Sequence, residues 1–125
     1  MMIQWFSKNE KMALATIYAT NITINKVGLD LIGPAYACML GLDVDDGKIA
    51  LQAVSKDRYD REEFPKDYLF VLSGGKTYTR ISSTDFVSKV SDYLHYDFKE
   101  GQKKFECYFD HHENLLIIDL KKEVK

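Results

Sequence analysis

Residues 22–54, ITINKVGLDLIGPAYACMLGLDVDDGKIALQAV, contain the pattern that decides the fold. Apolar and polar residues alternate from Ile22 to Asn25, as in a strand with one buried face, and the Asn25 side chain can cap a following helix. Gly33 and Pro34 then end that helix. The predicted elements, in order, are a strand at 22–25, a short helix ending at 33–34, a strand at 36–42, a turn at 45–47 and a strand at 48–54.

The same order of elements recurs in residues 76–120. The second set comprises a strand at 77–81, a helix at 84–94, a strand at 104–109, a turn around 111–114 and a strand at 115–120. A charged connector at 55–67, with a helical turn around 58–63, separates the two repeats. We therefore expect a single domain over residues 1–125, of the α+β class and mostly β. In it, two β-α-β-β repeats form a pseudo-symmetric sheet or open barrel.

The segments outside the repeats give four further predictions. They are a strand at 13–19 that continues after Asn21, a hairpin between 68–72 and 76–81 that turns at 73–75, a frayed tail at 121–125, and packing anchors at Trp5 and Phe6. If duplication produced the scaffold, we expect any specialised function in the second repeat, which holds most of the aromatic residues and all three histidines, or at the seam between the repeats.

The charge balance gives the whole molecule no attraction to nucleic acid or to an anionic membrane. The chain has 17 basic and 19 acidic residues, a formal net charge of −2. Only Arg58, Arg61 and Arg80 are arginines, the side chain best suited to phosphates and guanine edges. The N-terminus lacks the basic and apolar regions of a signal peptide, and no run approaches the ~18 apolar residues of a membrane helix. We therefore expect a cytoplasmic protein with no membrane partner.

Two stretches resemble ligand-binding loops but lack required residues. Gly75-Lys76-Thr77 resembles the end of a phosphate-binding P-loop, yet Phe70 stands where the first glycine is needed and a strand, not a helix, follows. Residues 43–47 resemble the start of a calcium loop, but Lys48 and Val54 occupy its glycine and glutamate positions. We interpret both as ordinary turns.

Nothing in the sequence identifies a catalytic nucleophile. Cys38 and Cys107 each lie in an apolar predicted strand, where a thiol is usually buried and inert. No serine stands on a G-x-S-x-G elbow. The sequence therefore favours a protein that is not an enzyme, and it predicts no cofactor.

The densest group of potential metal ligands lies around His111 and His112. With a third group, such as His95, two imidazoles at a turn suit zinc or nickel. Adjacent residues of an extended chain point apart, however, and a metal site needs a complete, preorganised shell. A polar loop tip is the competing interpretation, and we favour it.

Basic and aromatic residues give a second candidate site. Lys26, Lys48, Lys76 and Arg80 are the candidate nucleic-acid contacts, provided that they share one face. Residues 76–80 alternate cations with an aromatic ring, Lys-Thr-Tyr-Thr-Arg, as a stacking platform for single strands does. Core packing is the competing role for most of the rings in the second half of the chain.

Residues 22–26, 31–33 and 42–51 resemble the swapped-hairpin domains of AbrB- and MraZ-type bacterial transcription regulators. In that family a strand runs into a helix ending in Leu-Gly, and a hairpin with an acidic-glycine turn follows. MraZ-type chains carry two such units. The resemblance implies sequence-specific DNA binding by an oligomer or pseudo-dimer. The family's clustered arginines and its Asp-x-x-x-Arg motif are not matched, since Pro34 follows Asp30 by four positions and Lys89 follows Asp85.

Three functional hypotheses follow. The first is a non-enzymatic, bacterial or phage-type cytoplasmic module that dimerises through its hairpins and binds duplex DNA at low salt. The second is a small-molecule or metal-binding protein with its site near His111 and His112. The third is an assembly protein whose only activity is self-association. A homo-oligomer is expected, and nucleic acid is a candidate partner.

Overall fold

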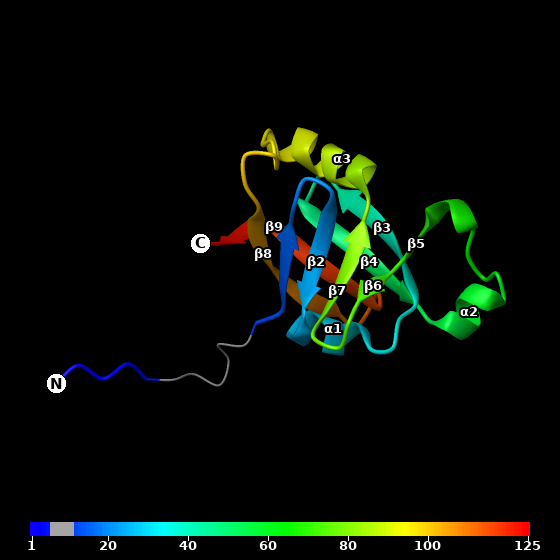
Figure 1. Ribbon diagram of the computed structural model, residues 1–125, viewed down its shortest axis with the longest axis horizontal. Helices are drawn as coiled ribbons and strands as arrows, with labels where there is room; N and C mark the ends of the chain where they lie inside the picture. The colour runs from blue at the N-terminus through cyan, green and yellow to red at the C-terminus, as the bar shows by residue number, and fades with distance from the viewer. Residues whose placement is uncertain (6–11) are drawn as a thin grey trace.

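The computed structural model describes residues 1–5 and 12–125. Its strands form one antiparallel sheet that curves into a nearly closed barrel (Figure 1). The strands are β1 (Leu14–Ile17), β2 (Asn21–Asn25), β3 (Ala37–Asp43), β4 (Lys48–Val54), β5 (Leu69–Val71), β6 (Ser73–Gly74), β7 (Tyr78–Ser82), β8 (Lys103–Asp110) and β9 (Leu115–Val124). The helices are α1 (Lys26–Ile32), α2 (Lys56–Asp60) and α3 (Thr84–Leu94), with a 3₁₀ turn, η1 (Lys66–Tyr68). The predicted class, α+β and mostly β, is confirmed.

The barrel closes where the two edge strands of the sheet follow each other in the chain. The strand order is β5-β3-β4-β9-β8-β1-β2-β7-β6, so β5 and β6 are the two edges of the sheet. Only Leu72 separates these edges in sequence. Its backbone N–H donates to the carbonyl of Tyr36 at 2.9 Å, just before β3. The two edges therefore meet as one interrupted strand.

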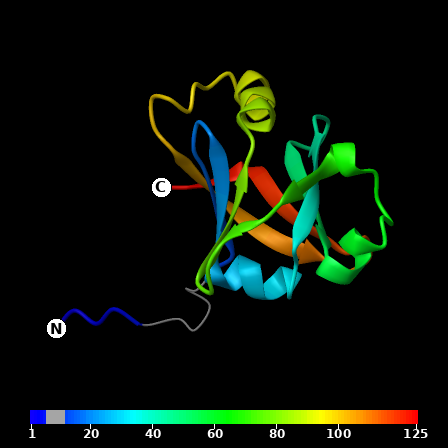
Figure 2. The same ribbon diagram turned by 45° about the vertical axis from the view of Figure 1, so that its right-hand side comes forward.

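The two halves of the chain pair through equivalent strands. The order β2-α1-β3-β4 recurs as β7-α3-β8-β9, and β2 pairs with β7 while β4 pairs with β9. The helices α1 and α3 lie at opposite ends of the barrel, as a twofold relation requires (Figures 1 and 2). The relation also includes β1, which lies between β2 and β8, and β5–β6, which connect β3 to β7. Each structural unit thus begins one strand earlier than the sequence repeats at 22–54 and 76–120.

Apolar side chains from every long strand fill the barrel. They include Ile22 and Ile24 of β2, Ile49 and Leu51 of β4, Ile81 of β7, Phe105 of β8, and Leu116 and Ile118 of β9, all at most 1% exposed. The alternation of residues 22–25 therefore predicts correctly which side chains of β2 point into the barrel and which point outward. Val87 and Val90 bring α3 onto the same core.

Asn25 caps α1 through its side-chain oxygen, as predicted. Ser83 caps α3 in the same way. Gly47, at φ 67°, ends the turn between β3 and β4, a conformation that favours glycine. The predicted helix at 84–94 matches α3, while the helical turn expected around 58–63 lies earlier, in α2.

Four predictions about neighbouring segments are wrong. Residues 13–24 form a hairpin, β1–β2, rather than one interrupted strand. The hairpin partner of β7 is β6, whereas β5 pairs with β3. The tail does not fray, because Glu123 and Val124 pair with β8. Trp5 is 84% exposed and anchors nothing, while Phe6 lies outside the described residues. The first three errors concern which distant segment a strand meets.

The two cysteines are structural, as predicted. Cys38 is fully buried in β3, and Cys107 packs against the core from β8. Burial raises the pKa of each thiol to about 12, because the low-dielectric interior disfavours the thiolate. Neither thiol has the electropositive, accessible surroundings of a reactive cysteine.

Candidate nucleic-acid interface

The outer surface of β1, β2 and β7 is polar. Because Ile22, Ile24 and Ile81 point into the barrel, the residues that alternate with them point outward. The pairing of the strands sets Arg80 beside Thr23 and Tyr78 beside Asn25. Two adjacent strands thus present a guanidinium, a phenol, a hydroxyl and an amide on one side.

These outward side chains surround a shallow hollow of ≈ 410 Å³. It is lined by Tyr18, Asn21, Thr23, Tyr78 and Arg80, which we call the Arg80 face. Tyr18 follows β1 and Tyr78 begins β7, so the two rings stand at opposite ends of β2. Four residues of strand, about 13 Å, separate the positions along β2 that they flank. The hollow therefore has an aromatic ring at each end and polar groups between them.

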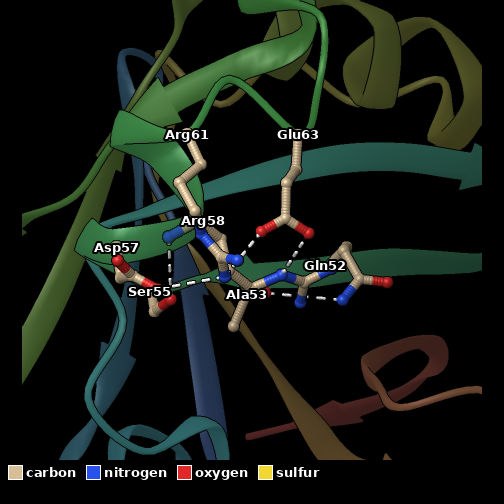
Figure 3. A network of polar contacts seen from close by, with 7 residues as sticks. All are labelled: Gln52, Ala53, Ser55, Asp57, Arg58, Arg61 and Glu63. Atoms are coloured by element: carbon tan, nitrogen blue, oxygen red, sulfur yellow. Dashed lines mark hydrogen bonds and ion pairs between the residues drawn. The ribbon is translucent and has the colours of Figure 1, made fainter.

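Arg80 is the only arginine without an ion pair among residues 1–5 and 12–125. Arg61 contacts Asp57 at 3.0 Å and Glu63 at 2.8 Å, and Arg58 contacts Glu63 at 3.3 Å (Figure 3). These ion pairs lie within the charged connector and join α2 to the residues that follow it. The guanidinium of Arg80 instead lies 5.4 Å from the ring centroid of Tyr78 and is exposed. An arginine of this kind keeps all its hydrogen-bond donors available to a ligand.

The four predicted nucleic-acid contacts do not share one face. Lys76 lies in the turn before β7, two residues from Tyr78, and Lys26 follows Asn25, the strand partner of Tyr78. These two lysines therefore border the end of the Arg80 face. Lys26 is ion-paired with Asp30, whereas Lys76 has no ion pair in the described part of the chain.

Lys48 lies elsewhere. It begins β4, which is separated from β7 by β3, β5 and β6 in one direction around the barrel and by β9, β8, β1 and β2 in the other. Its ammonium is 5.6 Å from the Tyr108 ring centroid and 4.0 Å from Asp46. A hydrogen bond to Tyr108 raises the pKa of Lys48. We therefore exclude Lys48 from the Arg80 face.

One further cation extends the polar surface. Across the sheet, Arg80 pairs with Thr23, Thr23 with Thr16, and Thr16 with Lys104 of β8. Lys104 is exposed. Thr16 is only 9% exposed, so Thr23 is the accessible hydroxyl between these two cations.

The histidines do not converge. His111 and His112 lie in the exposed turn between β8 and β9, where the His111 ring stacks 4.9 Å from Phe109. His95 is the C-cap of α3 and lines a small hollow with Leu120. Leu120 lies five residues after Leu115, where β9 leaves the turn that holds His111 and His112. No group of three or more His, Cys, Asp or Glu residues poised for a metal ion occurs in residues 1–5 and 12–125. The structure therefore does not complete the predicted site.

The two loop-like motifs are turns, as interpreted. Gly75-Lys76-Thr77 connects β6 to β7, with no helix after it. The Asp43 carboxylate accepts from the backbone N–H groups of Asp45 and Asp46, both at 3.1 Å. Asp110 does the same for His112 and Glu113 at 2.9 and 3.2 Å. These carboxylates close their own turns.

A different outer surface, over β3, β4 and β9, is apolar. It contains a hollow of ≈ 290 Å³ lined by Met39, Leu40, Gly41, Ala50, Gln52, Tyr68 and Leu115. Val71 of β5 is 51% exposed, and Tyr108 of β8 is 41% exposed. We call Met39, Gly41, Ala50, Tyr68 and Leu115 the apolar face.

Sequence reasoning found Lys76, Tyr78 and Arg80 but missed Tyr18, Asn21 and Thr23. The alternation of residues 21–25 marks Asn21 and Thr23 as outward-facing. What the sequence does not carry is the pairing of β2 with β7, which brings residues more than fifty positions apart together.

The described residues contain no helix long and apolar enough to cross a membrane. Comparison of the chain with family models, with curated proteins and with solved structures found no match.

Proposed function

We propose that this protein is a non-enzymatic, cytoplasmic nucleic-acid-binding module that contacts the phosphate backbone through the Arg80 face. The observation that carries the proposal is the free guanidinium of Arg80 beside a hollow lined with hydrogen-bonding side chains. A guanidinium binds phosphate through two parallel hydrogen bonds. Asn21 and Thr23 add an amide and a hydroxyl at the same hollow, and such groups commonly contact phosphate and sugar.

The neighbouring lysines support the same ligand. Lys104 lies on the same side of the barrel as Arg80, Lys76 lies in the turn before β7, and neither has an ion pair among the described residues. With Lys26, this side offers up to four phosphate contacts. Each contact to duplex DNA adds roughly −0.9 to the slope of log affinity against log salt, so three to four contacts predict a slope of about −2.7 to −3.6. Such a protein binds in low salt despite a net charge of −2.

Fluorescence anisotropy with labelled 20-mer DNA, both duplex and single-stranded, tests the proposal near 50 mM salt. Arg80→Ala and Lys76→Ala should each weaken binding and reduce the salt slope by about one. Arg61→Ala is the matched control, because that arginine is already occupied by Asp57 and Glu63. Absence of binding to either DNA by the parent protein would overturn the proposal.

The doubled β-α-β-β order supports the resemblance to AbrB- and MraZ-type regulators. The described structure places two hairpins of opposite halves side by side, through the β4–β9 pairing. On this proposal, one chain provides the pseudo-dimer that the resemblance implies.

The apolar face favours a second candidate function, self-association into a homodimer. Exposed apolar patches commonly mark protein–protein interfaces, and the surface above Gly41 is open, since nothing lies within 4 Å of a Cβ built on it. Sedimentation should show a dimer that Ala50→Arg dissociates, while Thr23→Arg, on the opposite polar side, leaves it intact. A parent protein that stays monomeric at 100 μM or above would exclude this function.

A further inference from the structure

The Arg80 face has the features of a site for unpaired bases rather than for a duplex. This inference rests on the proposed function and specifies its ligand. We propose that single-stranded nucleic acid binds along β2, with bases stacking on Tyr18 and Tyr78 and an intervening phosphate on Arg80. No other part of the described surface joins two accessible rings, a free guanidinium and a hollow.

The arrangement of the rings is the first argument. Tyr18 is 39% exposed, although tyrosines in a core are covered. Tyr78 is half-buried and keeps one side toward the hollow. The two tyrosines flank positions about 13 Å apart along β2, and both line the hollow of ≈ 410 Å³. A base can reach such a ring only when it is not already stacked inside a duplex.

The second argument is the position of the charge. The guanidinium of Arg80 lies 5.4 Å from the centroid of Tyr78, and Arg80 pairs with Thr23 in the middle of β2. A phosphate held by Arg80 therefore lies between the two rings. Asn21 and Thr23 line the hollow. The Thr23 hydroxyl donates to Asn21 Oδ1 at 3.2 Å and Asn21 Nδ2 donates to Thr20 at 3.1 Å, so Thr23 can accept from a ligand and Asn21 keeps one amide hydrogen to donate.

The third argument is the shortage of cations. Non-specific duplex binding comes almost entirely from phosphate neutralisation, and a protein can make roughly six to ten such contacts. The Arg80 face and its borders supply Arg80, Lys76, Lys104 and the ion-paired Lys26. Base stacking compensates for few charges, since each stacked base changes affinity between about fivefold and a hundredfold. A single strand gains that contribution and a duplex does not.

Anisotropy with labelled dT₁₂ and with a duplex of matched length tests the inference on the full chain. We expect the parent protein to bind dT₁₂ at least tenfold more tightly than the duplex. Tyr18→Ala and Tyr78→Ala should each weaken dT₁₂ binding by about fivefold or more. Tyr78→Phe should stay within about twofold of the parent, because the ring face remains. Tyr68→Ala is the matched control, since Tyr68 is 65% exposed on the apolar face.

A direct readout of stacking is available because Trp5 is the only tryptophan. In a Trp5→Phe background, Tyr18→Trp places the sole indole at the end of the hollow. Added dT₁₂ should quench its fluorescence, whereas the same indole introduced by Tyr68→Trp should not respond.

The outcomes separate this inference from the proposed function. Duplex binding that equals dT₁₂ binding and ignores both Tyr→Ala substitutions overturns the stacking inference and leaves the proposed function standing. Absence of binding to both DNAs overturns the two together. Preference for dT₁₂, with loss in both Tyr→Ala variants and recovery in Tyr78→Phe, supports both.

Discussion

The side-chain Oδ1 of Asn25 accepts a hydrogen bond from the backbone N–H of Leu14 at 3.0 Å and so joins the start of α1 to the start of β1. The same oxygen accepts from Gly28 N at 3.1 Å, which is the cap of α1. The Nδ2 group donates to the carbonyl of Met12 at 2.7 Å. One side chain therefore orders a helix terminus and the first strand of the barrel.

Asn25→Ala should cost more than the loss of an ordinary helix cap. A cap contributes about 1 kcal/mol, and an orphaned, partly buried N–H costs about 1–3 kcal/mol more. We expect the free energy of unfolding to fall by about 2–4 kcal/mol in total, as measured by urea denaturation. Ser83→Ala is the matched control, because Ser83 caps α3 through one bond to Phe86 N at 3.1 Å. Equal costs for the two variants would show that the bond to Leu14 contributes nothing.

Asn25 also shows which part of the fold the sequence predicts. Its capping role follows from the residues directly after it, and the sequence predicts that role correctly. Its bonds to Met12 and Leu14 span 13 and 11 positions, and no local pattern encodes them. The same limit applies to the hairpins, since the elements at 68–82 are predicted but their partners are not.

Gly28→Ala should destabilise the protein, although alanine is the better helix former. A Cβ at position 28 would overlap Cγ2 of Ile24, a core side chain with no exposed surface. Helix propensity would add up to about 1 kcal/mol of stability, but overpacking costs about 1–3 kcal/mol. We expect a net loss of about 1–2 kcal/mol by thermal or chemical denaturation. The sequence shows the cost of glycine in a helix but not its cause, which is close packing of α1 on β2.

Gly41→Ala is the control for that variant. Gly41 lies in β3, where nothing lies within 4 Å of the added Cβ and φ is not positive. Replacing it with alanine should leave stability unchanged or raise it by up to about 1 kcal/mol. If Gly28→Ala proves equally benign, the close approach between α1 and β2 is refuted.

Removing residues 121–125 should destabilise the barrel. Lys104 pairs with Val124 and Phe105 with Glu123, and the Lys103 ammonium lies 3.0 Å from the Glu123 carboxylate. Each lost backbone hydrogen bond costs about 0.5–1.5 kcal/mol, so we expect a loss of about 2 kcal/mol in urea denaturation. Glu123→Gln removes only the half-exposed ion pair and should cost less than about 1 kcal/mol. A truncated chain as stable as the parent would mean that the end of β9 is dispensable.

The cysteine pKa values predict that both thiols resist modification in the folded protein. Burial raises each pKa from 9.0 to about 12, so the thiolate fraction at pH 8 falls about a thousandfold. Reaction with a disulfide reagent at pH 8 should therefore be slower by about that factor than in the chain unfolded by guanidinium. Rapid native-state reaction of either cysteine would contradict its burial.

The same pKa values predict how the free energy of unfolding changes in alkaline solution. Below about pH 9, both thiols are protonated in the folded and unfolded states, so they add no pH dependence. Between pH 9 and about 12 the unfolded chain loses the two protons while the folded chain keeps them, so stability falls as pH rises. Each thiol contributes up to about 1.4 kcal/mol per pH unit. Cys38→Ala/Cys107→Ala should show a shallower decline than the parent in urea titrations at pH 8 to 10.5. Parallel curves for the two proteins would show that the thiols are not the groups responsible.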